Sequence, residues 1–197
     1  LSGAAMPCRA TAAVSIEAFY GLARPPSADF SAAVSGAADD PNLIDNSLNI
    51  AGGNLLLHLG MFEVGAIADV SWKSGSASQT ALGALVGVGG DVGRSLRLEL
   101  LGEIGGHRYG NFTENPDIVT ASSSSEWLAY VGLRPGIALR FPMGDMGFLV
   151  GVWGFARWDL TTSDVPVTVG SADSASPGSV ELGGTTIGMV ARVGFDF

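Results

Sequence analysis

The chain has 197 residues, of which 47% are hydrophobic, 15% are charged and 29 are glycines. The hydrophobic content excludes an intrinsically disordered chain, and the absence of a Gly-X-Y period excludes collagen. The formal net charge of −9 argues against nucleic-acid binding, since phosphate recognition needs a positive field. The mean hydropathy is +0.35, yet no run of about 18 apolar residues is present that could cross a membrane as a helix.

Cysteine and histidine are scarce. Cys8 is the single cysteine, and His58 and His107 are the two histidines. An internal disulfide and a thiolate or His-rich metal centre are therefore excluded, and we predict neither a metal nor a cofactor.

Residues 1–12 are predicted to be an N-terminal tail or a signal-peptide remnant, because Ala10-Thr11-Ala12 has the small-x-small form of an export cleavage site. After this point apolar residues recur at every second position. Eight segments carry this alternation: 13–21, 49–59, 63–73, 80–90, 95–109, 126–141, 147–160 and 181–197.

The alternation is clearest in 126–141. One face of this segment is wholly apolar from Trp127 to Phe141, and the other holds Arg134 and Arg140. A period of two with chemically different faces indicates a β-strand. Eight such segments and no convincing helix predict an all-β chain.

The connections differ in length. Those after the second, fourth and sixth segments are short, namely 60–62, 91–94 and 142–146. The others are mostly long: 22–48, 74–79, 110–125 and 161–180. This predicts an up-and-down meander with both termini beside the short turns. Ten strands would need an additional hairpin, for which 22–48 is the only place.

Aromatic residues mark both ends of the apolar faces. We expect interfacial aromatics at the long-connection ends (Tyr20, Trp72, Trp127, Trp158) and at the short-turn ends (Phe62, Phe141, Phe148, Phe197). Phe62 and Trp72 are ten residues apart, and ten tilted strand residues rise about 25 Å, the height of a barrel's apolar band. The opposite faces carry mostly Gly, Ser, Tyr and Arg, as in a crowded interior. The alternation therefore predicts a membrane barrel with its apolar side outward.

The opening strand Val14–Gly21 and the ending Val190–Phe197 resemble eight-stranded outer-membrane barrels of the OmpA/OmpX/opacity-protein type. The resemblance covers residues 13–197. It implies a closed antiparallel eight-stranded transmembrane β-barrel, located in the bacterial outer membrane and in contact with its lipid and lipopolysaccharide. It also implies that the barrel-assembly machinery recognises the last strand as a signal, through Val193, Gly194, Phe195 and Phe197.

Six acids and five bases are predicted to face the lumen: Glu17, Glu63, Asp69, Glu99, Glu103, Asp159, Arg97, Arg134, Arg140, Arg157 and Arg192. Eight strands enclose little more than side chains, so these charges should pair. If residues 109 and 126 face each other, Arg134 lies diagonally between Glu99 and Glu103, and its forked guanidinium is expected to bridge the two carboxylates. Pro135 cannot donate to a ladder, which predicts a bulge or bend that leaves the register beyond it open.

A charge-paired lumen favours a non-enzymatic, plugged barrel that presents loops for interaction, adhesion or envelope stability, alone or in a larger assembly. The alternative is a narrow, porin-like passive channel. A lipid A-modifying enzyme is less favoured, since His107-Arg108-Tyr109 has Tyr where lipid A deacylases place a serine nucleophile. No catalytic residue is predicted. The acidic loops, with Asp39 and Asp40, form either a solvated surface or one that binds a protein partner or divalent cations.

Overall fold

The computed structural model describes residues 13–26, 30–32, 47–74, 76–93, 95–112, 118–122, 125–144, 146–169 and 176–197. The predicted tail, residues 1–12, lies outside these ranges. None of the described segments is a helix long and apolar enough to span a membrane.

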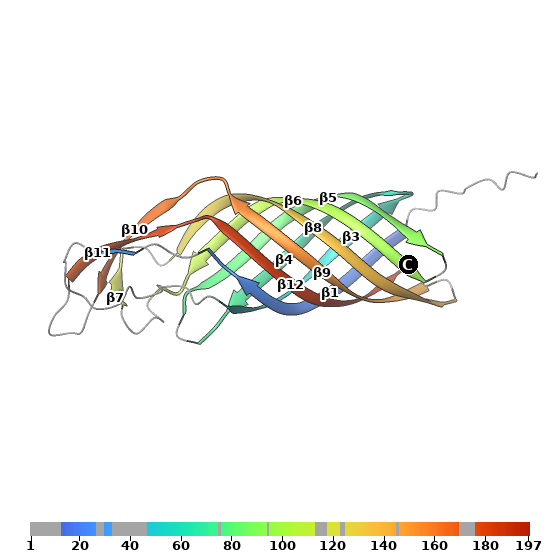
Figure 1. Cartoon of the computed structure of the whole chain (residues 1–197), viewed down its shortest axis with the longest axis horizontal. Coiled ribbons are helices and arrows are strands. Elements are labelled where there is room, and N and C mark those ends of the chain that lie inside the picture. Colours follow the sequence, from blue (N-terminus) through green and yellow to red (C-terminus); the bar gives the residue numbers. More distant parts are fainter. Residues whose placement is uncertain are drawn as a thin grey trace, which may run out of the picture.

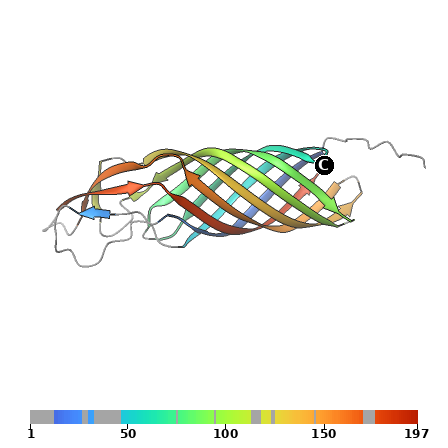
Figure 2. The ribbon, with the colours of Figure 1, turned by 45° about the horizontal axis from the view of Figure 1, so that its top comes forward.

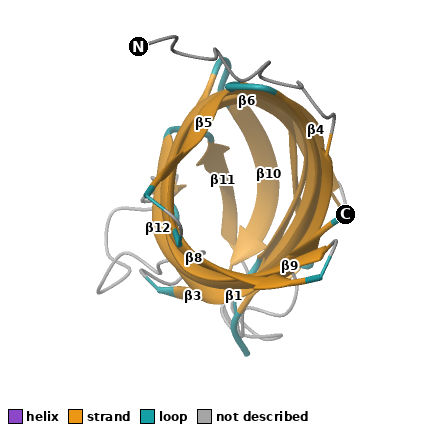
Figure 3. Ribbon diagram, turned by 90° about the vertical axis from the view of Figure 1, so that its right-hand side faces the viewer, coloured by secondary structure: helices purple, strands orange, loops and turns teal. Residues whose placement is uncertain are grey.

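Eight strands form a closed barrel (Figure 1). They are β1 (Ala13–Arg24), β3 (Leu48–Leu59), β4 (Phe62–Trp72), β5 (Ser78–Val92), β6 (Leu96–Gly110), β8 (Ser125–Met143), β9 (Met146–Asp159) and β12 (Thr185–Asp196). Each strand is antiparallel to its neighbours, and β12 returns to β1 to close the ring (Figure 3). The predicted all-β, eight-stranded, antiparallel barrel is confirmed.

The alternation in the sequence decides which side chains enter the barrel. On β4, Glu63 is fully buried, whereas its neighbour Val64 is 40% exposed. Successive strand residues point to opposite sides of the wall, so one period-two pattern gives an apolar exterior and a polar interior.

Pro135 does not introduce the predicted bulge. It lies opposite Leu100 in an unbroken ladder between β6 and β8. On the other side of the strand, the pairing of β8 with β9 is interrupted between Leu133 and Gly136. Beyond Gly136 it continues in the same register. The facing residue on β9 is Gly154, and a Cβ built there would make only an ordinary van der Waals contact with the proline ring, at 3.9 Å. The expectation of a bulge was therefore wrong, and the register beyond Pro135 is unchanged.

A second, smaller sheet stands at the long-connection end of the barrel (Figures 1 and 2). It has the order β2-β11-β10-β7. Its strands are β2 (Phe30–Ala32), β11 (Ser176–Leu182), β10 (Ser163–Val169) and β7 (Ile118–Ala121). These residues come from three connections that the sequence analysis treated as irregular, or in part as the last barrel strand.

The small sheet changes two predictions, one about the last strand and one about the connection 22–48. The segment 181–197 is not one strand, because Gly183 and Gly184, with φ of 119° and 128°, separate β11 from β12. Residues 30–32, within the connection considered for an additional barrel hairpin, instead pair with β11. The barrel itself keeps eight strands.

An apolar layer joins the small sheet to the barrel. The sheet contributes Val165, Val167, Val180 and Leu182, and the outer part of the barrel contributes Leu48, Ala77, Tyr109, Phe112 and Leu128. All of these side chains are buried. Seen along the axis, β10 and β11 lie across the far end of the lumen (Figure 3). We call these nine residues the mouth layer.

Candidate functional site

The outer surface of the barrel is apolar between two groups of aromatic residues. Those predicted at the long-connection end, Tyr20, Trp72, Trp127 and Trp158, are 38–56% exposed. Tyr20 and Trp72 touch, with their ring centroids 6.4 Å apart. At the turn end, Phe62, Phe141 and Phe197 are exposed, and the half-buried Phe148 packs against Phe195. So large an exposed apolar surface is stable only against lipid.

Within the predicted assembly signal the side chains alternate across the wall. Val193, Phe195 and Phe197 are exposed, whereas Gly194 is buried against the lumen residue Glu17.

The lumen is filled by charged side chains that reach one another across the barrel. At the turn end, Arg97 contacts Glu63 and donates to Glu99 Oε1 at 2.7 Å. Arg140 donates from Nε to Asp196 Oδ2 at 2.9 Å. Asp196 was not among the predicted charge partners, although the period-two pattern of the last strand places it on the lumen face, where it is buried.

In the middle of the barrel, Arg192 joins two carboxylates from different strands. Its Nη1 lies 3.0 Å from Glu17 Oε2 and 2.6 Å from Glu99 Oε2. The indole Nε1 of Trp153 donates to the same Glu99 oxygen at 3.0 Å. Glu99 is therefore satisfied by Arg97, Arg192 and Trp153.

Nearer the long-connection end, Arg157 is the central cation. It donates to both oxygens of Asp69, at 3.0 and 2.5 Å, and to Glu103 Oε1 at 2.7 Å. Tyr130 also donates to Glu103, at 2.5 Å. Bidentate pairs of this kind are the strongest ionic contacts that a guanidinium makes.

Arg134 lies where the sequence predicted it, between Glu99 and Glu103, but its pairing differs from the prediction. Residues 109 and 126 do pair, which sets Arg134 opposite Leu101. Its guanidinium donates to Glu103 at 3.2 Å, but the structure shows no contact with Glu99. The expected bridge between the two glutamates was wrong, because Arg97 and Arg192 occupy the carboxylate of Glu99.

Asp159 is the one predicted acid of this set that contacts no arginine in the described part of the chain. It accepts from the Tyr109 hydroxyl at 2.6 Å and lies 2.9 Å from His107 Nδ1. His107 also stacks on Tyr130 with centroids 4.2 Å apart. This cluster lies directly beneath the mouth layer, to which Tyr109 belongs.

A group that sequence reasoning missed lies at the turn end. His58 Nε2 is 2.9 Å from Ser15 Oγ, and its Nδ1 is 3.0 Å from Glu63 Oε1. The connectivity is that of a Ser-His-Glu triad. However, Arg97 Nη2 lies 2.7 Å from the same Nδ1, and a guanidinium can only donate.

Nδ1 of His58 therefore lies between a guanidinium and a carboxylate, an arrangement unlike that of a catalytic triad, in which only the carboxylate faces this nitrogen. Ser15 and Glu63 are also fully buried, so no substrate reaches the hydroxyl. His58 therefore belongs to the charge network at the turn end.

The comparisons with known proteins bear on the fold. The outer-membrane protein OprG from Pseudomonas aeruginosa has a similar structure, with a TM-score of 0.59, 11% identity, and 95% of this chain and 96% of that chain covered. The N-terminal β-barrel domain of P. aeruginosa OprF aligns with a TM-score of 0.43 and 15% identity, over 95% of this chain and all of that one. The outer-membrane protein AlkL aligns at 0.45 and 11%, over 93% and 90% of the two chains. No family model matches the sequence, and no curated protein does.

This chain has the fold of an outer-membrane β-barrel. The apolar exterior and the two aromatic groups are those of a protein that resides in the bacterial outer membrane. The resemblance noted in the sequence is confirmed at the level of architecture and location.

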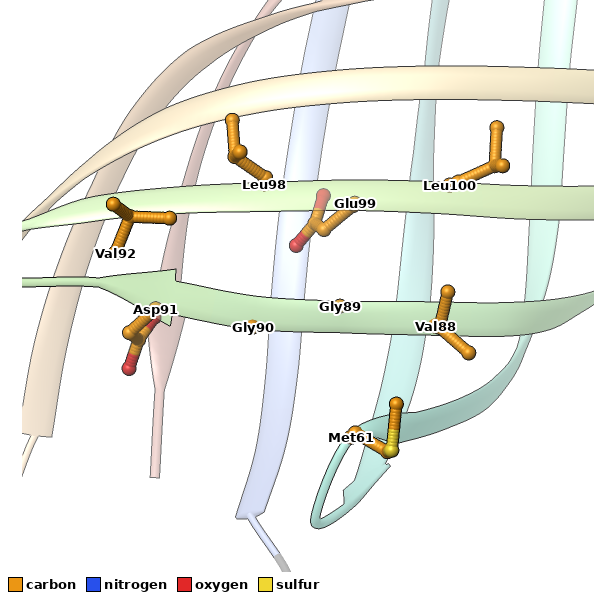
Figure 4. A pocket seen from close by; sticks show the side chains of 9 residues that line it. All are labelled: Met61, Val88, Gly89, Gly90, Asp91, Val92, Leu98, Glu99 and Leu100. Atoms are coloured by element: carbon orange, nitrogen blue, oxygen red, sulfur yellow. The ribbon is translucent and has the colours of Figure 1, made fainter.

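The described residues contain no cluster of three or more His, Cys, Asp or Glu that could hold a metal ion. A groove of about 450 Å³ lies on β5 and β6 near the turn end (Figure 4). Exposed Met61, Val92 and Leu98 line it, while Glu99, also at its edge, pairs inside the lumen. The groove is a hollow in the lipid-facing belt.

Proposed function

We propose that this chain is a non-enzymatic outer-membrane barrel with a closed lumen, whose ordered outer end presents a surface for interaction. The observation that carries this proposal is the filling of the lumen. Arg134, Arg157, Arg192, Tyr130 and Trp153 are each 2% exposed or less. Side chains of this size leave little room for water in an eight-stranded barrel.

The ion pairs run across the barrel, which supports the proposal that the lumen is closed. Arg157 lies on β9 and Asp69 on β4, which are four strands apart in a ring of eight. This pair therefore spans the full diameter of the barrel. An ion could pass only if a bidentate, buried pair opened, and separating such a pair is strongly unfavourable.

We propose that the mouth layer forms a second barrier, at the outer end of the lumen. Its valine and leucine side chains come from the small sheet and pack on Tyr109 and Leu128 of the barrel. The outward residues of the same sheet include exposed Asp164 and Glu181. We propose that this acidic, structured surface serves interaction, adhesion or envelope stability through a protein partner.

Planar-bilayer recording of the purified, refolded protein tests the closed lumen. We expect no discrete channel events from the wild type. A matched variant, Arg157→Ala combined with Trp153→Ala, removes the pair that spans the lumen and its neighbouring indole, and should conduct when folded. Discrete and reproducible events from the wild type would instead establish the narrow passive channel.

The non-enzymatic assignment is tested with a fluorophosphonate probe, which labels activated serines. Because the Ser15 side chain is fully buried and out of reach of the probe, we expect no labelling. Labelling that disappears in Ser15→Ala would show that the Ser15, His58 and Glu63 group is a hydrolytic triad.

A further inference from the structure

The described part of the lumen holds more carboxylates than arginines. Seven acids have side chains that are 5% exposed or less, and the five lumen arginines contact six of them. Asp159 is the acid that none of these arginines reaches. Because a buried carboxylate without a positive partner is costly, Asp159 needs another source of positive charge. The seven acids are Glu17, Glu63, Asp69, Glu99, Glu103, Asp159 and Asp196.

His107 supplies that charge when its ring is protonated. Its Nδ1 lies 2.9 Å from Asp159 Oδ1, and the two side chains are 1% and 0% exposed. A neutral imidazole beside this carboxylate would leave a net negative charge buried, whereas one additional proton on the pair removes it. The ring also stacks on Tyr130, with centroids 4.2 Å apart, and an aromatic face attracts a cation. The pair therefore holds this proton as a unit.

Within the described residues, no charged group other than Asp159 contacts the His107 ring. Tyr109 of β6 meets the edge of the ring, with centroids 6.0 Å apart, and Tyr130 of β8 covers one face. The opposite residue on β5 is Ala81, which does not titrate. Loss of the proton is therefore felt first by Asp159. The neighbouring charged groups are Arg157 of β9, Glu103 of β6 and Asp69 of β4, which bind one another, and the half-buried Glu126 of β8, opposite Tyr109.

Asp159 lies where the barrel meets the small sheet. It is the last residue of β9, and β10 begins shortly after it, at Ser163. Its backbone N–H donates to the carbonyl of Gly184 at 2.9 Å, in the break between β11 and β12. Its side chain accepts from Tyr109, a member of the mouth layer. Two connections of the small sheet and the apolar layer beneath it therefore meet at this residue.

We propose that His107 and Asp159 form a pH-dependent latch that holds the small sheet over the lumen. With the proton bound, the pair is neutral overall and Asp159 stays buried against Tyr109. When the proton leaves to solvent, the bare carboxylate moves toward water, and its contacts with Tyr109 and Gly184 are weakened. The proposal rests on the proposed function in one respect, namely that the mouth layer is a barrier at the outer end.

The direction of the pH effect follows from proton binding. The latched sheet binds one more proton than the loosened sheet, so rising pH favours loosening. The stabilisation is complete at low pH and is lost as pH rises through the range in which histidine side chains ordinarily titrate, roughly pH 5 to 8. The barrel strands keep their arginine pairs throughout this range, because guanidinium groups stay charged.

Hydrogen exchange of the protein refolded in lipid vesicles tests the latch. Protection factors of the β10 and β11 amides at about pH 5 and pH 8 correct for the intrinsic effect of pH on exchange. Asp159→Asn removes the charge and keeps an oxygen that can accept from Tyr109, and His107→Gln removes the titrating ring. The control is His58→Gln, which removes the histidine at the turn end. Heat-modifiable migration on gels shows that each variant is folded.

We expect the protection of β10 and β11 in the wild type to fall about tenfold from the low to the high pH, with the barrel strands unchanged. Asp159→Asn should give the same protection at both pH values, His107→Gln should give low protection at both, and His58→Gln should behave as the wild type. Protection that does not change with pH in the wild type would overturn the proposal. A pH dependence that survives in Asp159→Asn, or disappears in His58→Gln, would also overturn it. Channel events in the bilayer experiment would defeat the closed lumen and leave the exchange result unaffected.

Discussion

The guanidinium of Arg134 reaches Glu103 Oε2 at 3.2 Å and is enclosed by the rings of Phe19, Trp153 and Phe155, whose centroids lie 5.1–5.4 Å from its central carbon. Its Nε and Nη1 have no hydrogen-bond partner. Arg157, by contrast, donates hydrogen bonds to both Asp69 and Glu103. Both arginines contact Glu103, but only the loss of Arg157 would leave a second buried carboxylate, that of Asp69, without its partner.

Arg157→Met should destabilise the barrel by about 3–5 kcal/mol, because it leaves Asp69 buried without its bidentate partner. Arg134→Met should cost about 1 kcal/mol, since Glu103 keeps Arg157 and Tyr130 and the aromatic cage accepts an apolar chain. Urea unfolding in lipid vesicles, followed by tryptophan fluorescence, gives both free energies. Equal losses for the two variants would contradict this ranking.

Gly136→Ala should destabilise the barrel by about 1–3 kcal/mol. A Cβ at this position would overlap the indole of Trp153, which is held in place by its hydrogen bond to Glu99. Gly90→Ala is the matched control, because a Cβ there meets nothing within 4 Å. The control should be neutral or stabilise by about 0.5 kcal/mol through reduced freedom of the unfolded chain. The same unfolding assay applies, and identical midpoints for the two variants would argue against packing on Trp153.

Val180→Asn should loosen the small sheet without unfolding the barrel. Val180 is fully buried in the mouth layer, and an amide buried there without a partner costs about 1–3 kcal/mol. We expect faster proteolysis of the connection between β9 and β12 in intact vesicles, with heat-modifiable migration retained. Glu181→Gln, at the exposed neighbouring position, should leave the cleavage rate unchanged. Equal cleavage rates in Val180→Asn and the wild type would show that the mouth layer does not hold the sheet.

Asp164→Lys should stabilise the small sheet by about 0.5 kcal/mol. Asp164 and Glu181 are direct cross-strand neighbours on β10 and β11, and both are exposed. Like charges in this arrangement repel, and lysine replaces the repulsion with attraction. Hydrogen exchange of the β10 and β11 amides should slow, with Asp164→Asn between the wild type and the lysine variant. Faster exchange in the lysine variant would refute this account of the pair.

The sequence by itself determined the wall of the barrel and the direction of each side chain. Period two is a property of the extended backbone, so the outward aromatics and the inward arginines could be assigned without coordinates. The alternation in Val165, Val167, Val180 and Leu182 carried the same signal for the small sheet. It went unrecognised because the segments are short and lie within long connections.

The tertiary structure alone decided which partners meet. Arg134 and Glu99 are correctly placed on the lumen face, yet they do not pair, because Arg97 and Arg192 reach Glu99 from other strands. His58 likewise meets Arg97, which is 39 residues away in the chain. Alternation fixes the side of the wall on which a residue lies. Contacts across the lumen depend on register and on closure of β12 against β1, which bring together residues whose sequence separation carries no pattern.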